Sequence, residues 1–389
     1  MYKPEVAKFS LVIRDVGEVI QDEADGKLPA HLTREFRSRE EAWAEYKREV
    51  EDKFWQSTFM WEVTVCVLDS KAATEPKYVI FAHFNHGATD GAAAMEALSE
   101  FVRVLSAGLT SRQSLPPHNF LGESLPVPKP FLERYPLFKF DDPASDDEKE
   151  ELFAKVIAKL STEEGRVHNA IADRMFTEEA TRRFIAKCKR SGVSVTAGLF
   201  AAVAMAAGAR KFDPIMPLSY RTKDNWGELA ASFTDASFSL DFTRVLEEEE
   251  GNGEEAVWVA MAREFHREIR KKLSSPEEMY RGLSLTFARS ALEEFKVSDA
   301  ICTGPNGDEF SMGLSNVGIM DGYFPEKDSP LCVSEVAGFC SNPYSLGIAF
   351  WCYTFRGKFR MCLADSIYGP KRRAFEDFAE KVFKIVEEI

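Results

Sequence analysis

Residues 77–91 read K-Y-V-I-F-A-H-F-N-H-G-A-T-D-G and place a histidine, a carboxylate and two glycines close together. His86 lies four residues before Asp90, and Gly87 and Gly91 directly follow these two residues. A histidine held in a tight turn titrates near neutrality and can take a proton from an attacking nucleophile. A general base is therefore one interpretation of His86. The alternative is a loop histidine that only contacts the backbone.

The residues around His86 predict a strand before it and a helix after it. Residues 78–84 form an apolar run with β-branched and aromatic side chains, which is typical of a fully buried strand. Residues 92–107 have helix-forming composition, and Asp90 is a good N-cap residue for that helix. The inner face of the helix is expected to carry Met95, Leu98, Phe101 or Val102, and Leu105.

The other side chains that could bind a metal or act as nucleophiles show no such pattern. His83 shares a strand face with Val79 and Phe81 and is expected to be a core histidine. We assign no metal, because no cluster at ligand spacing surrounds the remaining histidines, which are His31, His118, His168 and His266. The seven cysteines form no C-x-x-C pair, and such an odd, unpatterned set is typical of reduced thiols.

The spacing His86-x-x-x-Asp90-Gly91 resembles the H-x-x-x-D-G signature of the chloramphenicol-acetyltransferase-like acyltransferases. That superfamily includes plant and fungal alcohol acyltransferases and the condensation domains of peptide synthetases, and the resemblance is nearest to these two groups. The order of a buried strand, the motif and a helix rich in small residues strengthens the resemblance.

Later segments resemble the same family in the same order along the chain. Residues 193–209 combine V-S-V-T with an alanine-rich helix. Residues 217–221 resemble the apolar strand of the family that ends in an arginine, here Arg221. Residues 315–318 resemble its S-N-x-G segment. Apart from the resemblance, the helix in 193–209 is simply a buried core helix.

The resemblance implies an α/β (α+β) fold of two chloramphenicol-acetyltransferase-like lobes with a channel between them. A length of 389 residues also exceeds what one hydrophobic core usually serves. We place the N-terminal lobe, which carries the motif, at 1–140 and the C-terminal lobe at 141–389, because residues 115–151 have the proline-rich and acidic composition of a surface connection. In the family a strand and a helix precede the segment that corresponds to 2–14, and we find no equivalent here.

The resemblance also implies the chemistry, which is transfer of an acyl group from a CoA or phosphopantetheine thioester to a hydroxyl or, less readily, an amine. A thioester is already activated, so a single histidine that removes the acceptor proton suffices. Neither a G-x-S-x-G elbow nor a cysteine in an electropositive niche is present to form an acyl-enzyme. Two alternatives stay open: a condensation enzyme that takes acyl groups from a carrier protein, and a catalytically silent binding member of the fold.

Individual residues take roles from the resemblance. The family's aspartate points away from the histidine and pairs with an arginine of the other lobe, which matches Asp90 and Arg221. Gly91 is expected to let the helix begin close to the substrate. Asn85 stands where many members carry another histidine. The substrate or oxyanion set is Asn85, Ser315, Asn316 and Gly318. The alternative role for Ser315 and Asn316 is a strand-end turn that shapes the channel.

Composition limits the classes of partner and compartment. A net charge of −14 argues against a nucleic acid, because no basic surplus exists to displace counterions, although a local cluster of Lys and Arg could still hold an anionic cofactor. Residues 1–15 lack a basic start followed by an apolar block, so we expect no secretory signal. The low-polarity run 193–209 is shorter than the roughly 20 residues of a membrane span. We expect a cytoplasmic monomer whose partners are a small-molecule acyl acceptor and, in the condensation alternative, an acyl carrier protein.

Hydrophobic periodicity and turn residues predict the remaining elements. Strands are expected at 8–14, 61–69, 167–176, 215–221, 233–242, 331–338, 347–355 and 359–366. Helices are expected at 34–54, 147–160, 178–190, 197–209, 256–273 and 371–388. Thr177 is expected to cap the helix at 178–190, and Gly192 to end it.

Overall fold

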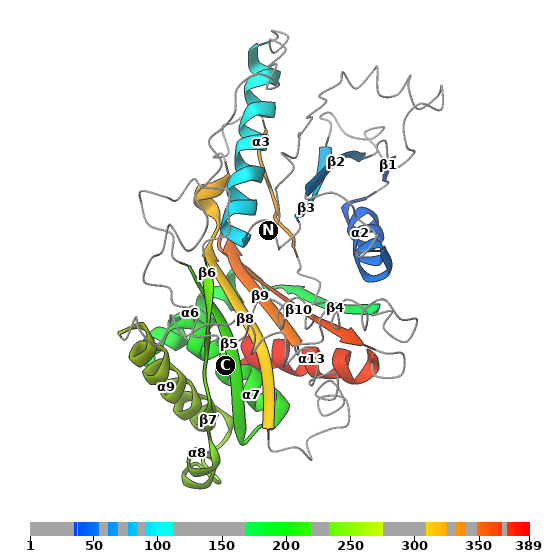
Figure 1. The fold of residues 1–389 in the computed structure, drawn as a ribbon. Helices are drawn as coiled ribbons and strands as arrows, with labels where there is room; N and C mark the ends of the chain where they lie inside the picture. Colours follow the sequence, from blue (N-terminus) through cyan, green and yellow to red (C-terminus); the bar gives the residue numbers. More distant parts are fainter. Residues whose placement is uncertain are drawn as a thin grey trace, which may run out of the picture.

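The described strands of the computed structural model form two separate sheets (Figure 1). The strands of the first sheet come from residues 35–84 and those of the second from residues 168–367. The predicted lobe boundary after residue 140, the predicted strand 8–14 and the predicted helix 147–160 lie outside the described residues. The structure describes residues 35–36, 38–53, 61–68, 77–84, 90–111, 168–219, 233–274, 309–324, 331–338, 348–367 and 372–389.

The first sheet consists of β1 (Glu35–Phe36), β2 (Trp61–Leu68) and β3 (Lys77–Phe84), in that spatial order. β2 and β3 are antiparallel, with Trp61 opposite Phe84, and β1 is parallel to β2. The strands predicted at 61–69 and 78–84 are confirmed. The side chains of residues 79–84 are half-buried, however, so the prediction of full burial was wrong. Among the described strands β3 pairs with β2 alone, which leaves it less enclosed than a central strand.

The helix predicted over 34–54 is shorter at its N-terminal end, because α2 spans Arg39–Lys53. Ser38 sets this start: its hydroxyl accepts a hydrogen bond from the Glu41 N–H at 3.1 Å, which is a typical N-cap contact. The residues just before the cap, Glu35 and Phe36, pair with β2 instead. A serine cap and a short strand therefore replace the expected first turn.

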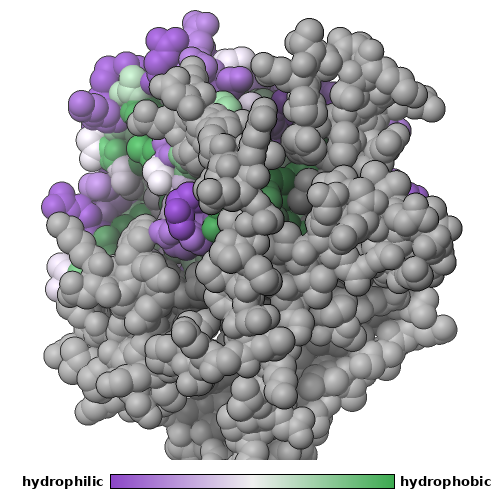
Figure 2. Space-filling model, turned by 90° about the horizontal axis from the view of Figure 1, so that it is seen from above, coloured by the Kyte–Doolittle hydropathy of each residue, from purple (hydrophilic) through white to green (hydrophobic). Residues whose placement is uncertain are grey.

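The long helix that extends away from the second sheet in Figure 1 is α3 (Gly91–Ser111). The helical periodicity left open whether Phe101 or Val102 lies on the inner face. Val102 is buried and Phe101 is half-buried, so Val102 is the core residue. Met95 and Leu98 pack beside Val102, as predicted. We call this group the junction cluster; its buried members are Val102, Met320, Phe324, Tyr353 and Phe355. Seen from above, hydrophilic side chains lie toward the rim of the described surface and apolar ones further in (Figure 2).

The second sheet is mixed and confirms the α/β (α+β) class. Its described strands lie in the order β4-β10-β9-β8-β5-β6, with β7 paired to β5. β8 is parallel to both β5 and β9, and the other pairs are antiparallel. The bounds are β4 His168–Met175, β5 Lys211–Ser219, β6 Phe233–Ser237, β7 Leu240–Asp241, β8 Glu309–Ile319, β9 Ile348–Phe355 and β10 Lys358–Ile367.

Helices cover one face of the second sheet (Figure 1). Alternate side chains of β10, Phe359, Met361 and Leu363, belong to the main hydrophobic core with this helical layer. Thr177 caps its first helix through the Ala180 N–H, as predicted. The helices are α6 (Glu178–Arg190), α7 (Val195–Ala207), α9 (Glu254–Leu273) and α13 (Arg372–Glu388), and a short helix, α8 (Thr243–Glu248), precedes α9.

The central helix of this layer is α7, which is buried on nearly all sides, as its composition predicted. Ser194 caps its start, and Gly208 ends it in the left-handed conformation. A Cβ at Gly198 would lie 2.8 Å from the Cys188 Sγ of α6 and 2.9 Å from the Trp258 ring of α9. Glycine at this position therefore allows the three helices to approach each other closely.

One strand predicted in the second lobe is interrupted, and another was wrong. The strand expected at 233–242 is divided into β6 and β7, because Pro214 of β5 has no N–H to donate where the ladder would continue. Residues 331–338 form no strand, because β9 already pairs with β8 on one edge and β10 on the other. The remaining elements predicted within the described segments are confirmed to within a few residues.

No single helix in the described segments is both long and apolar enough to cross a membrane. The pair α6 and α7 reaches that length and hydropathy only in combination, and the two helices are bent by 101° to each other.

Candidate active site

The structure defines the two elements that flank the histidine motif. β3 ends at Phe84 and α3 begins at Gly91, so Asn85 and His86 belong to the five residues between Phe84 and Asp90. Asn85, His86 and Arg221 lie outside the described residues, and their roles stay predictions.

Asp90 is the N-cap of α3, as predicted. Its Oδ1 accepts a hydrogen bond from the Ala93 N–H at 2.8 Å, and the residue is 6% exposed. One oxygen of this buried carboxylate is therefore engaged by the helix that follows the motif. At Gly91 an added Cβ would meet no atom of the described residues within 4 Å.

The S-N-x-G segment forms a bulge near the end of β8. Asn316 pairs with Cys352 of β9 and Gly318 with Tyr353, so one extra residue is accommodated on the β8 side. The Asn316 Oδ1 accepts a hydrogen bond from the Gly318 N–H at 3.0 Å. Gly318 has a φ of +86°, a conformation that suits glycine. This bulge of β8 thus contains Ser315, Asn316 and Gly318, and the hydrogen bond between Asn316 and Gly318 fixes its shape.

The other end of the Asn316 amide connects this bulge to the start of α7. The Asn316 Nδ2 donates to the Thr196 Oγ1 at 3.0 Å, and Thr196 is in the first turn of the helix. The preceding cap residue, Ser194, donates its backbone N–H to the His266 Nδ1 at 3.1 Å. Sequence reasoning missed both contacts, because 120 and 72 residues separate the partners. His266 of α9, for which the sequence indicated no role, thus orients the start of α7.

The elements around both motifs meet at the junction cluster. Ile80 of β3, Met95 of α3 and Val317 of the bulge all pack against it. Ser99 of α3 donates its hydroxyl to the carbonyl of Tyr323, in the short helix η5 (Asp321–Tyr323) that follows β8. The described neighbours of His86 and the S-N-x-G segment therefore belong to one packed region.

Three of the four cysteines whose side chains the structure describes are buried. Burial raises the pKa of the Cys188 thiol to about 12 and raises that of Cys352 as well. Cys362 is buried, whereas Cys332 is exposed. The described residues contain no group of three or more His, Cys, Asp or Glu side chains arranged to hold a metal ion.

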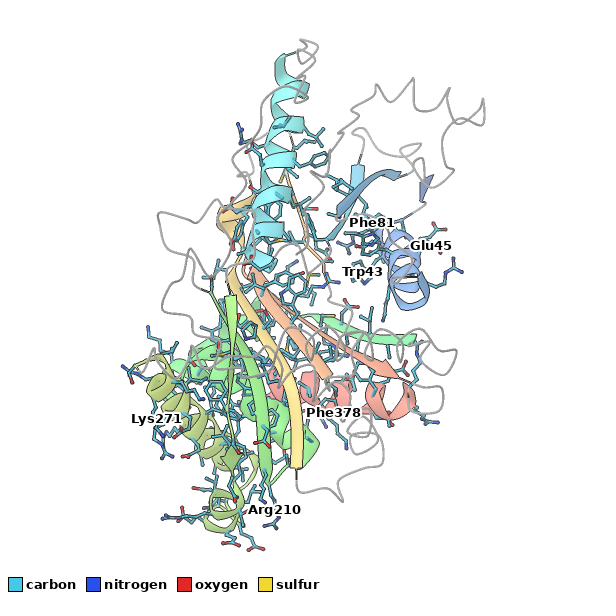
Figure 3. The ribbon with its side chains drawn as sticks, viewed as in Figure 1. Trp43, Glu45, Phe81, Arg210, Lys271 and Phe378 are labelled. Carbon is cyan, nitrogen blue, oxygen red and sulfur yellow. The ribbon has the colours of Figure 1, made fainter. Side chains whose placement is uncertain are left out.

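α2 lies between the two sheets and contacts both. The Tyr46 ring stacks on Phe81 at 4.3 Å and on His83 at 4.9 Å between centroids. Tyr46 also packs against Ile171 and Cys362 of the second sheet. In Figure 3, Trp43 lies on the side of α2 toward the second lobe, whereas Glu45 points outward. His83 therefore belongs to the packing between β3 and α2, in agreement with the core role predicted for it.

The sequence matches no protein-family model and no curated protein sequence. Among solved structures, the chain is similar to the trichothecene 15-O-acetyltransferase TRI3 of Fusarium sporotrichioides. The TM-score is 0.58 and the identity 12%, over 96% of this chain and 78% of that one. The chain has the chloramphenicol-acetyltransferase-like fold.

Two other solved structures are similar at lower TM-scores. Polyketide synthase associated protein 5 of Mycobacterium tuberculosis gives 0.48 with 13% identity, over 83% of this chain and 76% of that one. The epimerization domain from the third module of tyrocidine synthetase B gives 0.47 with 13% identity, over 91% and 79%. At these identities the likeness concerns the chloramphenicol-acetyltransferase-like fold alone, so the reaction has to be argued from the residues.

Proposed function

We propose that this chain transfers an acyl group from a CoA or phosphopantetheine thioester to a hydroxyl or amine acceptor, with His86 as the general base. His86 takes the acceptor proton while the acceptor atom bonds to the thioester carbonyl carbon. The tetrahedral intermediate collapses, the C–S bond breaks, and the leaving thiolate receives the proton from His86. The products are an ester or amide and a free thiol, so the mechanism needs no acyl-enzyme.

The observation that carries this proposal is the convergence of the motif's flanking elements and the S-N-x-G bulge on the junction cluster. Ile80 and Met95, on the two sides of the histidine motif, pack against the same cluster as Val317. The elements that flank the first segment and the bulge that contains the second, more than 200 residues away in sequence, thus pack against one cluster. An arrangement of base and oxyanion donors around one reacting carbonyl requires such convergence.

Asp90 caps α3 through one carboxylate oxygen, its Oδ1, which accepts a hydrogen bond from the Ala93 N–H. The role that we assign to Asp90 is therefore to fix the start of the helix that follows His86. The same histidine takes the acceptor proton and returns it to the leaving thiolate, so the proposed reaction needs no second acid or base.

The second lobe supplies a candidate hydrogen-bond donor to the oxyanion of the tetrahedral intermediate. One Asn316 N–H is used by Thr196, and the Oδ1 is used by Gly318, so the amide plane is held from both ends. We assign the second N–H of Asn316 to the oxygen of the tetrahedral intermediate. A donor fixed before the reaction stabilises that charge without reorganisation.

A thiol-release assay tests the proposal. Purified protein is incubated with acetyl-CoA or an acyl-phosphopantetheine and a panel of alcohols and amines, while the free thiol is measured. His86→Ala should lower turnover by about 10²–10⁴-fold without unfolding the protein, because general-base catalysis contributes about that much. The matched control is His118→Ala, a histidine outside the segments 86–91, 217–221 and 315–318, and this variant should keep its activity.

Two outcomes would contradict the proposal. A His86→Ala variant with near-normal turnover would remove the assigned base. Binding of CoA without thiol release from any donor would instead indicate a silent member of the fold. Activity with the phosphopantetheine donor alone would favour the carrier-dependent condensation enzyme over a CoA-dependent transferase.

A further inference from the structure

Arg360 of β10 is a charged residue buried between the lobes. It is 5% exposed, and its guanidinium donates to the Asp173 Oδ2 at 2.6 Å and to the Glu335 Oε1 at 2.8 Å. Burial alone would lower the pKa of Arg360, but the two carboxylates help to raise it overall, so the side chain stays charged. On β10 it alternates with the residues that face the helical layer, so it points to the opposite face of the sheet, where α2 lies.

Side chains of the first lobe complete this group. Arg39 at the start of α2 forms an ion pair with Glu335. Trp43 places its ring under the Arg360 guanidinium, 4.9 Å from the centroid, and its indole N–H donates to the Asp173 Oδ1 at 3.4 Å. Charges alternate along the row Arg39, Glu335, Arg360, Asp173, so the four groups balance. Of the two arginines in this row, Arg39 is half-exposed and Arg360 is buried.

Glu335 belongs to residues 331–338, which are held between the same two lobes. The Tyr353 hydroxyl donates to the carbonyl of Val336 at 2.7 Å. Leu331, Val333 and Val336 pack against the junction cluster, which also contains Val102 of α3. Backbone and apolar contacts therefore fix the segment from which Glu335 reaches both Arg39 and Arg360.

We propose that Arg39, Trp43, Glu335, Arg360 and Asp173 form an inter-lobe clamp. If the lobes separated, Arg360 would lose Trp43, and Glu335 would lose Arg39. Such losses oppose separation, because Arg360 would give up its cation–π contact with Trp43, and Glu335, which is 20% exposed, would give up one of its two arginine partners. The clamp fixes α2, and α2 supports β3, the strand that leads to His86. Arg39 and Glu335 are thus positioning residues for the transfer reaction, and this second step rests on the proposed function.

Arg39 allows a test that leaves the buried pair intact. Arg39→Gln removes the half-exposed end of the row, and Arg39→Lys keeps its charge. Arg48→Gln is the matched control, because Arg48 is on the same helix but pairs with Glu45 on α2 itself. Hydrogen exchange of the α2 and 331–338 peptides reports lobe contact without reference to activity, and steady-state kinetics reports positioning.

Arg39→Gln should accelerate exchange in both peptides about threefold or more, whereas Arg39→Lys and Arg48→Gln should match the wild type. The kcat of Arg39→Gln should fall about tenfold with KM nearly unchanged, because small displacements of a catalytic group are costly. Unchanged exchange would overturn the clamp. Faster exchange with unchanged kcat would overturn the positioning role. A wild-type protein without transferase activity would refute the proposed function and the positioning role. The hydrogen-exchange result would in that case still test whether the clamp holds the lobes together.

Discussion

Asn316 can be changed in two ways that separate its structural from its catalytic role. Asn316→Ala removes the acceptor of the Gly318 N–H and the donor to Thr196. Asn316→Asp keeps an acceptor for Gly318, and the Thr196 hydroxyl can rotate to donate to the second oxygen. The aspartate variant therefore keeps the bulge and replaces a neutral donor with a negative charge.

The magnitudes follow from these two contacts. A part-buried hydrogen bond contributes about 0.5–1.5 kcal/mol, and an unsatisfied buried donor costs about 1–3 kcal/mol. Asn316→Ala should therefore lower the free energy of unfolding by about 1–3 kcal/mol, whereas Asn316→Asp should stay within about 1 kcal/mol of the wild type. Loss of an oxyanion donor typically lowers kcat by about 10²–10³-fold, so both variants should lose turnover by that order.

Urea unfolding and the thiol-release assay measure the two effects on the same samples. Asn252→Ala is the control, because Asn252 is exposed and its side chain donates to Glu249, three residues away on the surface. The stability of this variant should change by less than about 0.5 kcal/mol. If Asn316→Asp were stable and fully active, the amide would only fix the bulge. If Asn316→Ala were as stable as the wild type, the two hydrogen bonds would not hold the bulge.

Two further predictions concern Asp90 and the cysteines. Asp90→Ala removes the cap of α3 and should lower the free energy of unfolding by about 0.5–2 kcal/mol, whereas Asp90→Asn keeps the cap and should change it little. The predicted pair with Arg221 would add a loss of about 3–5 kcal/mol in both variants. Thermal unfolding of the two variants therefore separates a cap from a charge pair. Under native conditions at mildly alkaline pH, mass spectrometry should find Cys332 alkylated and Cys188 and Cys352 protected, because burial keeps the latter two protonated. The acyl-transfer rate of the alkylated protein should stay within a few-fold of that of the unmodified protein. An acyl group trapped on a cysteine would contradict the mechanism without an acyl-enzyme.

Local chemistry made much of the fold and part of the site predictable. The Thr177 cap and the Asp90 cap each involve an N–H only three residues away, so residue types at short spacing indicate them. The buried character of α7 and the strand β3 follow in the same way from composition and periodicity. Sequence reasoning failed where a neighbour decided the outcome: 331–338 has strand composition, but both edges of β9 are already occupied.

Contacts across long sequence separations depended on the tertiary structure. Arg360 lies 187 residues from Asp173 and 25 from Glu335, and Asn316 lies 120 residues from Thr196. No periodicity relates such positions, because each pairing exists only after the sheets, α2 and α7 have packed. The sequence by itself determined which residues could remove a proton and which helices and strands flank them. The packing of the two sheets against α2 and the junction cluster decided which charges are buried together and which elements meet around the S-N-x-G bulge.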